Sequence, residues 1–146
     1  MAGSEFDSLP RPPCAELLDW KLVEIDKPGK RVRVSFTARQ EFVSSSGFIQ
    51  GGILAAMLDD TMGSAAFVIS DGKQFPSSID MNISFLAPAK VGKIFGEGTA
   101  IQLGKTIGYL QGELRDEAGT LLARATSSAR MVTTEVLPKS HKLHSD

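Results

Sequence analysis

The chain has 146 residues, of which 42% are hydrophobic and 23% charged, and its formal net charge is -1. This size and composition are typical of one globular domain with a single core. Proteins that bind nucleic acid or an anionic membrane surface usually have an excess of basic residues. This chain has no such excess, so we expect neither as a partner.

Only two histidines are present, His141 and His144, and both lie in the polar C-terminal tail. The body of the chain therefore lacks the residue that Ser-His-Asp triads, Cys-His pairs and histidine-ligated zinc sites require. Its chemistry has to come from carboxylates, hydroxyls, lysines or backbone amides. We expect no metal and no cofactor.

The domain is expected to span residues 7–136. Residues 1–6 include Gly3-Ser4-Glu5-Phe6, which resembles translated cloning sites, and residues 137–146 form a polar tail.

The N-terminus lacks a signal-peptide pattern, and acids interrupt the longest apolar run before it reaches membrane-spanning length. The single cysteine, Cys14, cannot form an internal disulfide, so a reducing, cytoplasmic location is predicted.

Taken in chain order, a proline-rich entry and a short helical turn at residues 14–19 come first. Residues 20–25 and 31–37 are predicted strands, joined into a hairpin by a turn that contains Pro28-Gly29. A glycine pair then opens the only long apolar segment. We expect this segment to form a helix over about residues 51–69.

Four further strands are predicted after the helix from alternating polarity and turn residues, arranged as a meander. They cover residues 77–86, 93–103, 107–115 and 121–132. One helix and roughly six mostly antiparallel strands indicate an α+β protein with a single sheet whose concave face is filled by the helix. In the first of the four strands, alternation puts Ile79, Met81, Ile83 and Phe85 on one face and Ser78, Asp80, Asn82 and Ser84 on the other.

A helical wheel separates two sides of the predicted helix. The side expected to pack on the sheet carries Leu54, Leu58, Ala65 and Ile69, widened by Met57, Thr61 and Val68. The opposite side is built of small residues, suited to a subunit contact, and carries Gly52, Ala56, Gly63 and Ala66 together with one acid, Asp59. We assign the neighbouring Asp60 a structural role.

The glycine pair has two interpretations, and the commoner one is a simple turn into the helix. In the other, the start of the helix offers unbonded amides, and Gly51 would let a carbonyl oxygen approach them closely. Gly51 and Asp59 are eight residues apart, about 12 Å along a helix at 1.5 Å per residue, which is too far for both to act on one carbon. If both are catalytic, each site combines the glycine of one subunit with the aspartate of another, as two antiparallel helices across a two-fold axis would allow.

The segment Gln50-Gly51-Gly52 followed by Asp59 resembles the hotdog-fold acyl-CoA thioesterases, within the 4-hydroxybenzoyl-CoA thioesterase superfamily and in particular its phenylacetate-degradation (PaaI-like) branch. The runs 78–89 and 114–125 are similar to the same family. In this family a His precedes the two glycines and an Asn stands in the loop before them. Here these positions hold Gln50 and Ser44.

The resemblance implies a hotdog fold and hydrolysis of an aryl- or medium-chain acyl-CoA to free acid and coenzyme A. Asp59 would be the base or nucleophile, the Gly51 amide would polarise the carbonyl, and Ser78 would orient the water or the aspartate. Ser44 would help to hold the water, and Gln50 and Gly52 would bind substrate. The resemblance also implies a homodimer with shared active sites, paired into a dimer of dimers. Because Gln50 and Ser44 replace the family's His and Asn, the alternative is a non-catalytic acyl-CoA-binding hotdog domain with a regulatory role.

Overall fold

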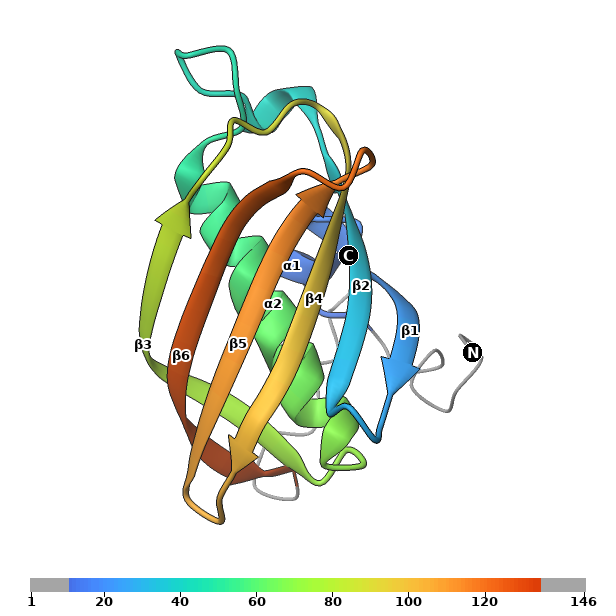
Figure 1. Cartoon of the computed structure of the whole chain (residues 1–146), viewed down its shortest axis with the longest axis vertical. Helices are drawn as coiled ribbons and strands as arrows, with labels where there is room; N and C mark the ends of the chain where they lie inside the picture. Colours follow the sequence, from blue (N-terminus) through green and yellow to red (C-terminus); the bar gives the residue numbers. More distant parts are fainter. Residues whose placement is uncertain (1–10, 135–146) are drawn as a thin grey trace, which may run out of the picture.

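A six-stranded antiparallel sheet curves around one long helix (Figure 1). The computed structural model describes residues 11–134, so the predicted cloning remnant at residues 1–6 and the tail at 137–146 lie outside the described residues. The long helix, α2 (Gly51–Ile69), begins and ends where the apolar segment predicts. The α+β class and the hotdog arrangement are thereby confirmed.

The six strands form in the regions predicted from alternation and turn residues. They are β1 (Lys21–Asp26), β2 (Arg31–Ala38), β3 (Gln74–Phe85), β4 (Gly92–Leu103), β5 (Ile107–Asp116) and β6 (Leu121–Thr133). Two short helical pieces accompany them, α1 (Pro13–Leu17) and the 3-10 turn η2 (Gln40–Phe42).

The predicted meander is wrong for β3. The strand order is β1-β2-β4-β5-β6-β3, so β2 pairs directly with β4 while β3 crosses to the far edge and pairs with β6. In the sequence, α2 and β3 thus lie between β2 and β4, although β2 and β4 are neighbours in the sheet. Among residues 11–134, only one edge of β3 is paired, since β3 ends the strand order. A strand with an open edge can pair with another chain.

The core forms where the apolar side of α2 packs on the sheet. Leu54, Leu58 and Ala65 are buried as expected, and so are Met57, Thr61 and Val68, while Ile69 is only partly buried. By length and composition α2 could cross a membrane. Its packing in the sheet accounts for that apolar character, because the core helix of a globular protein is apolar for the same reason.

Two glycines of β4 let the helix lie close to the sheet. A Cβ at Gly96 would stand 2.2 Å from Thr61 Oγ1, and one at Gly98 would stand 2.4 Å from the carbonyl oxygen of Thr61. Thr61 is fully buried, and its hydroxyl donates to the carbonyl of Met57, 2.7 Å away. Only glycine fits at these two strand positions without moving the helix backbone or the Thr61 side chain.

The opposite side of α2 is only partly open. Gly52, Ala56 and Asp59 are exposed, as the small-residue surface predicts. The prediction that Ala66 belongs to this open surface is wrong, because Ala66 is fully buried. Here β3 crosses the helix: a Cβ at Gly63 would lie 3.8 Å from Pro76 Cγ, so this strand covers part of the predicted surface.

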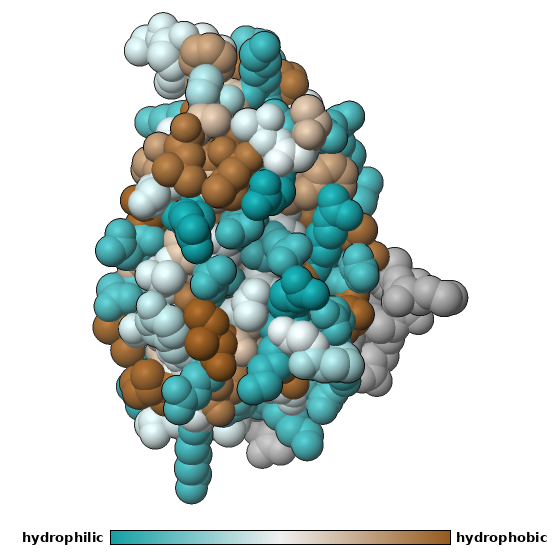
Figure 2. Space-filling model, in the orientation of Figure 1, coloured by the Kyte–Doolittle hydropathy of each residue, from teal (hydrophilic) through white to brown (hydrophobic). Residues whose placement is uncertain are grey.

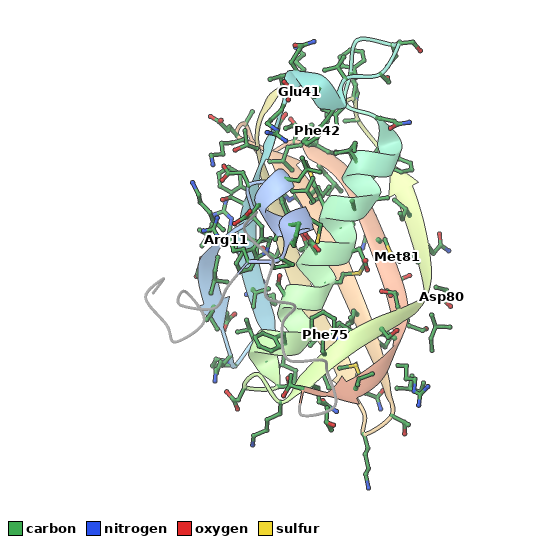
Figure 3. The ribbon with its side chains drawn as sticks, turned by 180° about the vertical axis from the view of Figure 1, so that it is seen from behind. Arg11, Glu41, Phe42, Phe75, Asp80 and Met81 are labelled. Atoms are coloured by element: carbon green, nitrogen blue, oxygen red, sulfur yellow. The ribbon has the colours of Figure 1, made fainter. Side chains whose placement is uncertain are left out.

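A bulge in β3 changes which side chains face the helix. Ser78 is paired with Ala129 and Asp80 with the adjacent Ser128, so Ile79 is an extra residue and is 60% exposed. The predicted alternation is therefore wrong at Ser78 and Ile79, because a bulge inserts one residue and reverses the facing of its neighbours. Met81 still packs against the core, and Asp80 still faces outward (Figure 3).

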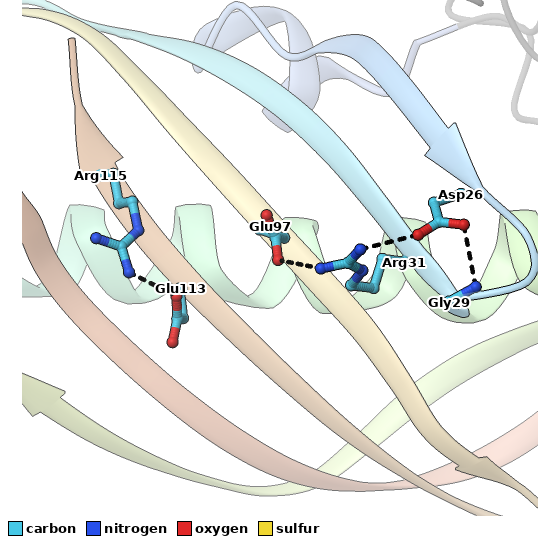
Figure 4. Close-up of polar contacts among 6 residues, drawn as sticks. All are labelled: Asp26, Gly29, Arg31, Glu97, Glu113 and Arg115. Atoms are coloured by element: carbon cyan, nitrogen blue, oxygen red, sulfur yellow. Dashed lines mark hydrogen bonds and ion pairs between the residues drawn. The ribbon is translucent and has the colours of Figure 1, made fainter. Parts of the chain in front are cut away.

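The outer face of the sheet is polar. Figure 2 shows mostly hydrophilic side chains there, with the hydrophobic ones in separate groups. Arg31 on β2 contacts Asp26 at 2.9 Å and Glu97 of β4 at 3.4 Å, and Arg115 contacts Glu113 at 3.2 Å (Figure 4). All of these side chains are at least partly exposed to water, so each pair adds little to stability.

Candidate active site

Asp59 and Ser78 meet on the open side of α2. The Ser78 hydroxyl donates a hydrogen bond of 2.8 Å to Asp59 Oδ1, from β3 to the helix. Both residues are exposed. The bulge at Ile79 makes this contact possible, because without it Ser78 would share the outward face of Asp80. A carboxylate that is held by a hydroxyl and reachable from solvent can act as a base or a nucleophile.

The start of α2 presents free backbone donors. Gln50 is the N-cap residue and makes no side-chain capping bond, so Gly51 and Gly52 are the first two helical residues. The amides of Ile53 and Leu54 donate to the Gln50 carbonyl. Within residues 11–134, the Gly51 and Gly52 amides have no hydrogen-bond acceptor. Such amides are suited to binding a negatively charged or polarised oxygen.

Backbone hydrogen bonds hold the loop before α2. The Gln50 amide donates to Phe42, the Ile49 amide to Ala89 in the loop after β3, and the Ser44 amide to Phe48. The helix start is thereby fixed to η2 and to the end of β3. The Ser44 hydroxyl is already engaged, since its Oγ lies 2.8 Å from Ser46 Oγ within the same turn.

The predicted site residues fall into two groups. Asp59 and Ser78 form one group, and the loop and helix start, with Ser44, Gln50, Gly51 and Gly52, form the other (Figure 3 shows the helix from this side). Two helical turns, about 12 Å, separate Gly51 from Asp59. One chain therefore does not bring both groups to a single reacting carbon.

Three surface hollows lie elsewhere, among β1, β2, β4 and β5 and between β3, β5 and β6, and none is lined by residues of either group.

Asp60, for which the sequence predicts a structural role, has a partly buried carboxylate. Its Oδ2 atom is buried and has no hydrogen-bond partner within the described part of the chain. Burial raises the pKa of Asp60 to about 6, and the negative charge of Asp59 contributes to the rise. Its backbone carbonyl accepts from Ser64, whose hydroxyl in turn accepts from the Trp20 indole at 3.0 Å. Only the proximity of two acids in an apolar helix hinted at this in the sequence.

Neither group of site residues carries a set of metal ligands. Among residues 11–134, no three His, Cys, Asp or Glu side chains are grouped so that they could hold a metal ion. What the described residues offer at the site is a carboxylate, a hydroxyl and two backbone amides.

Known proteins resemble this chain in sequence and in fold. Residues 46–123 match the sequence model of the thioesterase superfamily. The phenylacetic acid degradation-related protein of Ralstonia eutropha JMP134 is 30% identical, with a TM-score of 0.77 over 84% of this chain and 92% of that one. Human acyl-coenzyme A thioesterase 13 is 29% identical over 66% of this chain and 69% of its own length.

A third protein shares the fold at lower identity. The protein smu.793 of Streptococcus mutans UA159, solved with acetyl CoA bound, has a TM-score of 0.69 at 16% identity and covers 78% of this chain and 89% of its own. The family match extends over more than half of the chain and includes both the helix start and Asp59. The chain belongs to the thioesterase superfamily and is a thioester hydrolase with the hotdog fold.

Proposed function

We propose that this protein hydrolyses aryl- or medium-chain acyl-CoA to the free acid and coenzyme A. The related human protein is named an acyl-coenzyme A thioesterase, and the Ralstonia protein is described as phenylacetic acid degradation-related. The Streptococcus protein of the same fold binds acetyl CoA. These names support a coenzyme A thioester as substrate and an aryl acyl group as the first to test.

The carboxylate of Asp59 supplies the attack. Acting as a base, it takes a proton from water while the hydroxide oxygen forms a bond to the thioester carbonyl carbon. The carbon–sulfur bond then breaks, and the coenzyme A thiolate leaves and recovers a proton. A thiolate needs little acid assistance as a leaving group, so this chemistry can proceed without histidine. Ser78 orients the carboxylate through its hydrogen bond of 2.8 Å.

The carbonyl oxygen is held by the other group of residues. The free amide of Gly51 donates to it as negative charge develops, which is commonly the largest contribution to acyl-transfer catalysis. Gly52 and Gln50 bind the substrate beside it, and Ser44 helps to hold the attacking water. Since about 12 Å separates Gly51 from Asp59 along one helix, the Gly51 amide comes from the second subunit.

A homodimer with two shared sites supplies that subunit. The open edge of β3 and the exposed helix residues Gly52, Ala56 and Asp59 lie on one side of the molecule, and the edge is apolar at Ile79. Ile101 on β4 and Ile107 and Tyr109 on β5 are exposed large hydrophobic residues, and they support pairing into a dimer of dimers. We place the enzyme in the cytoplasm. Light scattering during size-exclusion chromatography tests the assembly: a monomer that retains full activity would contradict the shared site.

The observation that carries the proposed mechanism is the hydrogen bond between Ser78 and Asp59 on an accessible part of α2. Asp59→Asn keeps the shape and can still accept that bond, but it removes the charge. We expect thiol release from benzoyl-CoA, phenylacetyl-CoA and hexanoyl-CoA to fall at least about 100-fold, within the range of general base catalysis.

Asp80→Asn is the matched control. Asp80 lies on the same strand, two residues from Ser78, but on the outer face, where its carboxylate accepts from the Ser128 amide. An asparagine can accept that bond too, so turnover should stay within about twofold of the unmodified protein. If Asp59→Asn retains full turnover, Asp59 is not the catalytic carboxylate.

A further inference from the structure

Phe85, the last residue of β3, lies directly over the start of α2. Its Cζ, Cε1 and Cε2 atoms stand 3.3, 3.4 and 3.7 Å from the position that a Cβ on Gly51 would take. The ring therefore occupies the space beside the first helical amide. Phe85 is nevertheless 54% exposed, so more than half of this large apolar side chain is not used by the core.

The backbone on both sides of this contact is fixed. Phe85 pairs with Ala123 in the β3–β6 ladder, and the next amide, that of Leu86, donates to Leu122 at 2.8 Å. The helix start is tied to the same region, because the Ile49 amide donates to Ala89. The backbone of Phe85 is thus held in a fixed position relative to the start of α2, and the ring lies against Gly51.

We propose that Phe85 is a specificity-determining residue, a flat wall against which the acyl group lies when its carbonyl is bound at the Gly51 amide. This inference rests on the proposed function, since it assumes that the Gly51 amide binds the thioester carbonyl. A carbonyl oxygen accepting from this amide lies about 3 Å from its nitrogen, which brings the first acyl carbons within van der Waals reach of the ring. The substrate class is then an acyl-CoA whose acyl group is aromatic close to the carbonyl.

The preference follows from the geometry of aromatic contacts. Two rings in offset or edge-to-face contact gain about 0.5–1.5 kcal/mol beyond the area they bury, whereas an alkyl chain on the same ring gains only the area term. Converted at 1.4 kcal/mol per tenfold, this is a discrimination of roughly twofold to twelvefold. An aryl ring attached at or next to the carbonyl carbon reaches Phe85, and a straight alkyl chain has no face to stack.

The test compares acyl groups in Phe85→Leu, measuring kcat/KM by thiol release for benzoyl-CoA, phenylacetyl-CoA and hexanoyl-CoA. Leucine retains an apolar side chain but has no ring. We expect the ratio of aryl to hexanoyl kcat/KM to fall about twofold to twelvefold, with hexanoyl-CoA itself changing less than about twofold. An unchanged ratio would overturn the proposal. So would an equal loss for all three substrates, which would place the ring against the coenzyme A arm that they share.

Phe75→Leu is the matched control. Phe75 is on the same strand, is 46% exposed, and lies near the C-terminal end of α2, away from Gly51 (Figure 3). The aryl-to-hexanoyl ratio should not change in this variant. A thermal melt of both variants should show that Phe85→Leu remains folded, as expected for a residue that is more than half exposed.

A binding measurement separates this inference from the proposed hydrolysis. S-phenacyl-CoA and S-(2-oxoheptyl)-CoA carry the carbonyl one carbon from sulfur and cannot be hydrolysed. By titration calorimetry the unmodified protein should bind the phenacyl compound more tightly, and Phe85→Leu should lose that preference. If thioesters are not hydrolysed but the preference is present and depends on Phe85, the hydrolysis proposal fails and the specificity role stands. If hydrolysis is confirmed and neither assay shows a preference that depends on Phe85, the specificity role fails alone.

Discussion

The Ser78 hydroxyl donates to Asp59 Oδ1 across 2.8 Å, joining the edge strand β3 to the middle of the central helix. The two residues are 19 positions apart in the chain, and a one-residue bulge at Ile79 sets the facing that allows them to meet. A hydrogen bond to a charged group is stronger than a neutral one, about 1.5–3 kcal/mol.

Ser78→Ala should therefore slow the chemical step. Because both groups are exposed, solvent replaces part of the lost bond, so we expect kcat to fall about tenfold with KM changed less than about twofold. Ser84→Ala is a suitable control, since Ser84 is exposed on the same strand and its side chain makes no hydrogen bond within residues 11–134. A higher KM with unchanged kcat would show that Ser78 binds substrate rather than positioning the carboxylate.

Asp60 should make the protein less stable as the pH rises from about 4 to 6. Its pKa is raised from 3.8 to about 6 in the folded state, so the folded protein binds this proton more tightly than the unfolded chain. Stability is then lost between the unfolded and the folded pKa and stays level above the latter. The shift alone corresponds to about 3 kcal/mol, and we expect roughly 1 kcal/mol after solvent screening, because the side chain is only partly buried.

The measurement is urea unfolding at several pH values for the unmodified protein and Asp60→Asn. The variant should be more stable by about 1 kcal/mol at pH 7 and should lack this contribution to the pH dependence, while the two proteins converge near pH 4. If the variant were less stable at pH 7 and the pH dependence were unchanged, the charged form of Asp60 would have a stabilising partner, for example across a subunit contact.

Gly98→Ala should destabilise the fold, because the new Cβ would stand 2.4 Å from the Thr61 carbonyl oxygen and 3.1 Å from Ala65 Cβ. Neither neighbour is a flexible side chain, so the strand and the helix must separate. Overpacking of this kind costs typically 1–3 kcal/mol.

Gly63→Ala, on the opposite side of the same helix, provides the contrast. Its Cβ would meet Pro76 Cγ at an ordinary 3.8 Å, in the middle of α2. Alanine is the better helix former, so this variant should be more stable by about 0.5–1 kcal/mol. Denaturant midpoints that fall equally for both variants would contradict the close approach of α2 to β4.

The sequence predicts the elements of this fold better than their neighbours in space. The helix starts at Gly51 and ends at Ile69 as expected, because apolar periodicity and flanking glycines are local signals. The position of β3 beside β6 is not encoded by any turn, since the pairing joins segments that are distant in the chain. The bulge at Ile79 has no local marker either, and it reversed the predicted facing of Ser78.

The site could also be predicted only in part, because local sequence signals locate its residues but not their contacts with distant segments. The resemblance around Gln50-Gly51-Gly52 and Asp59 locates the residues, and helix geometry alone shows that Gly51 and Asp59 cannot act on one carbon. The positions of Phe85 over Gly51 and of the buried Asp60 oxygen depend on tertiary packing. Local polarity patterns do not report either one.

The central claim, that each site is completed by a second subunit, is tested most directly by mixing two inactive variants. Gly51→Pro removes the amide hydrogen at the first helical position, where proline is well accepted, and Gln50 already has the extended backbone (φ -60°, ψ 138°) that must precede it. Asp59→Asn removes the carboxylate. Each variant alone should release almost no thiol from phenylacetyl-CoA.

Coexpressed in equal amounts, the two variants should recover about a quarter of the wild-type activity. Half of the dimers are then mixed, and each mixed dimer has one intact site of its two, built from the Gly51 of one subunit and the Asp59 of the other. If every site were contained within one subunit, no mixed dimer would hold an intact site. Activity that stays at the level of the separate variants would contradict the account.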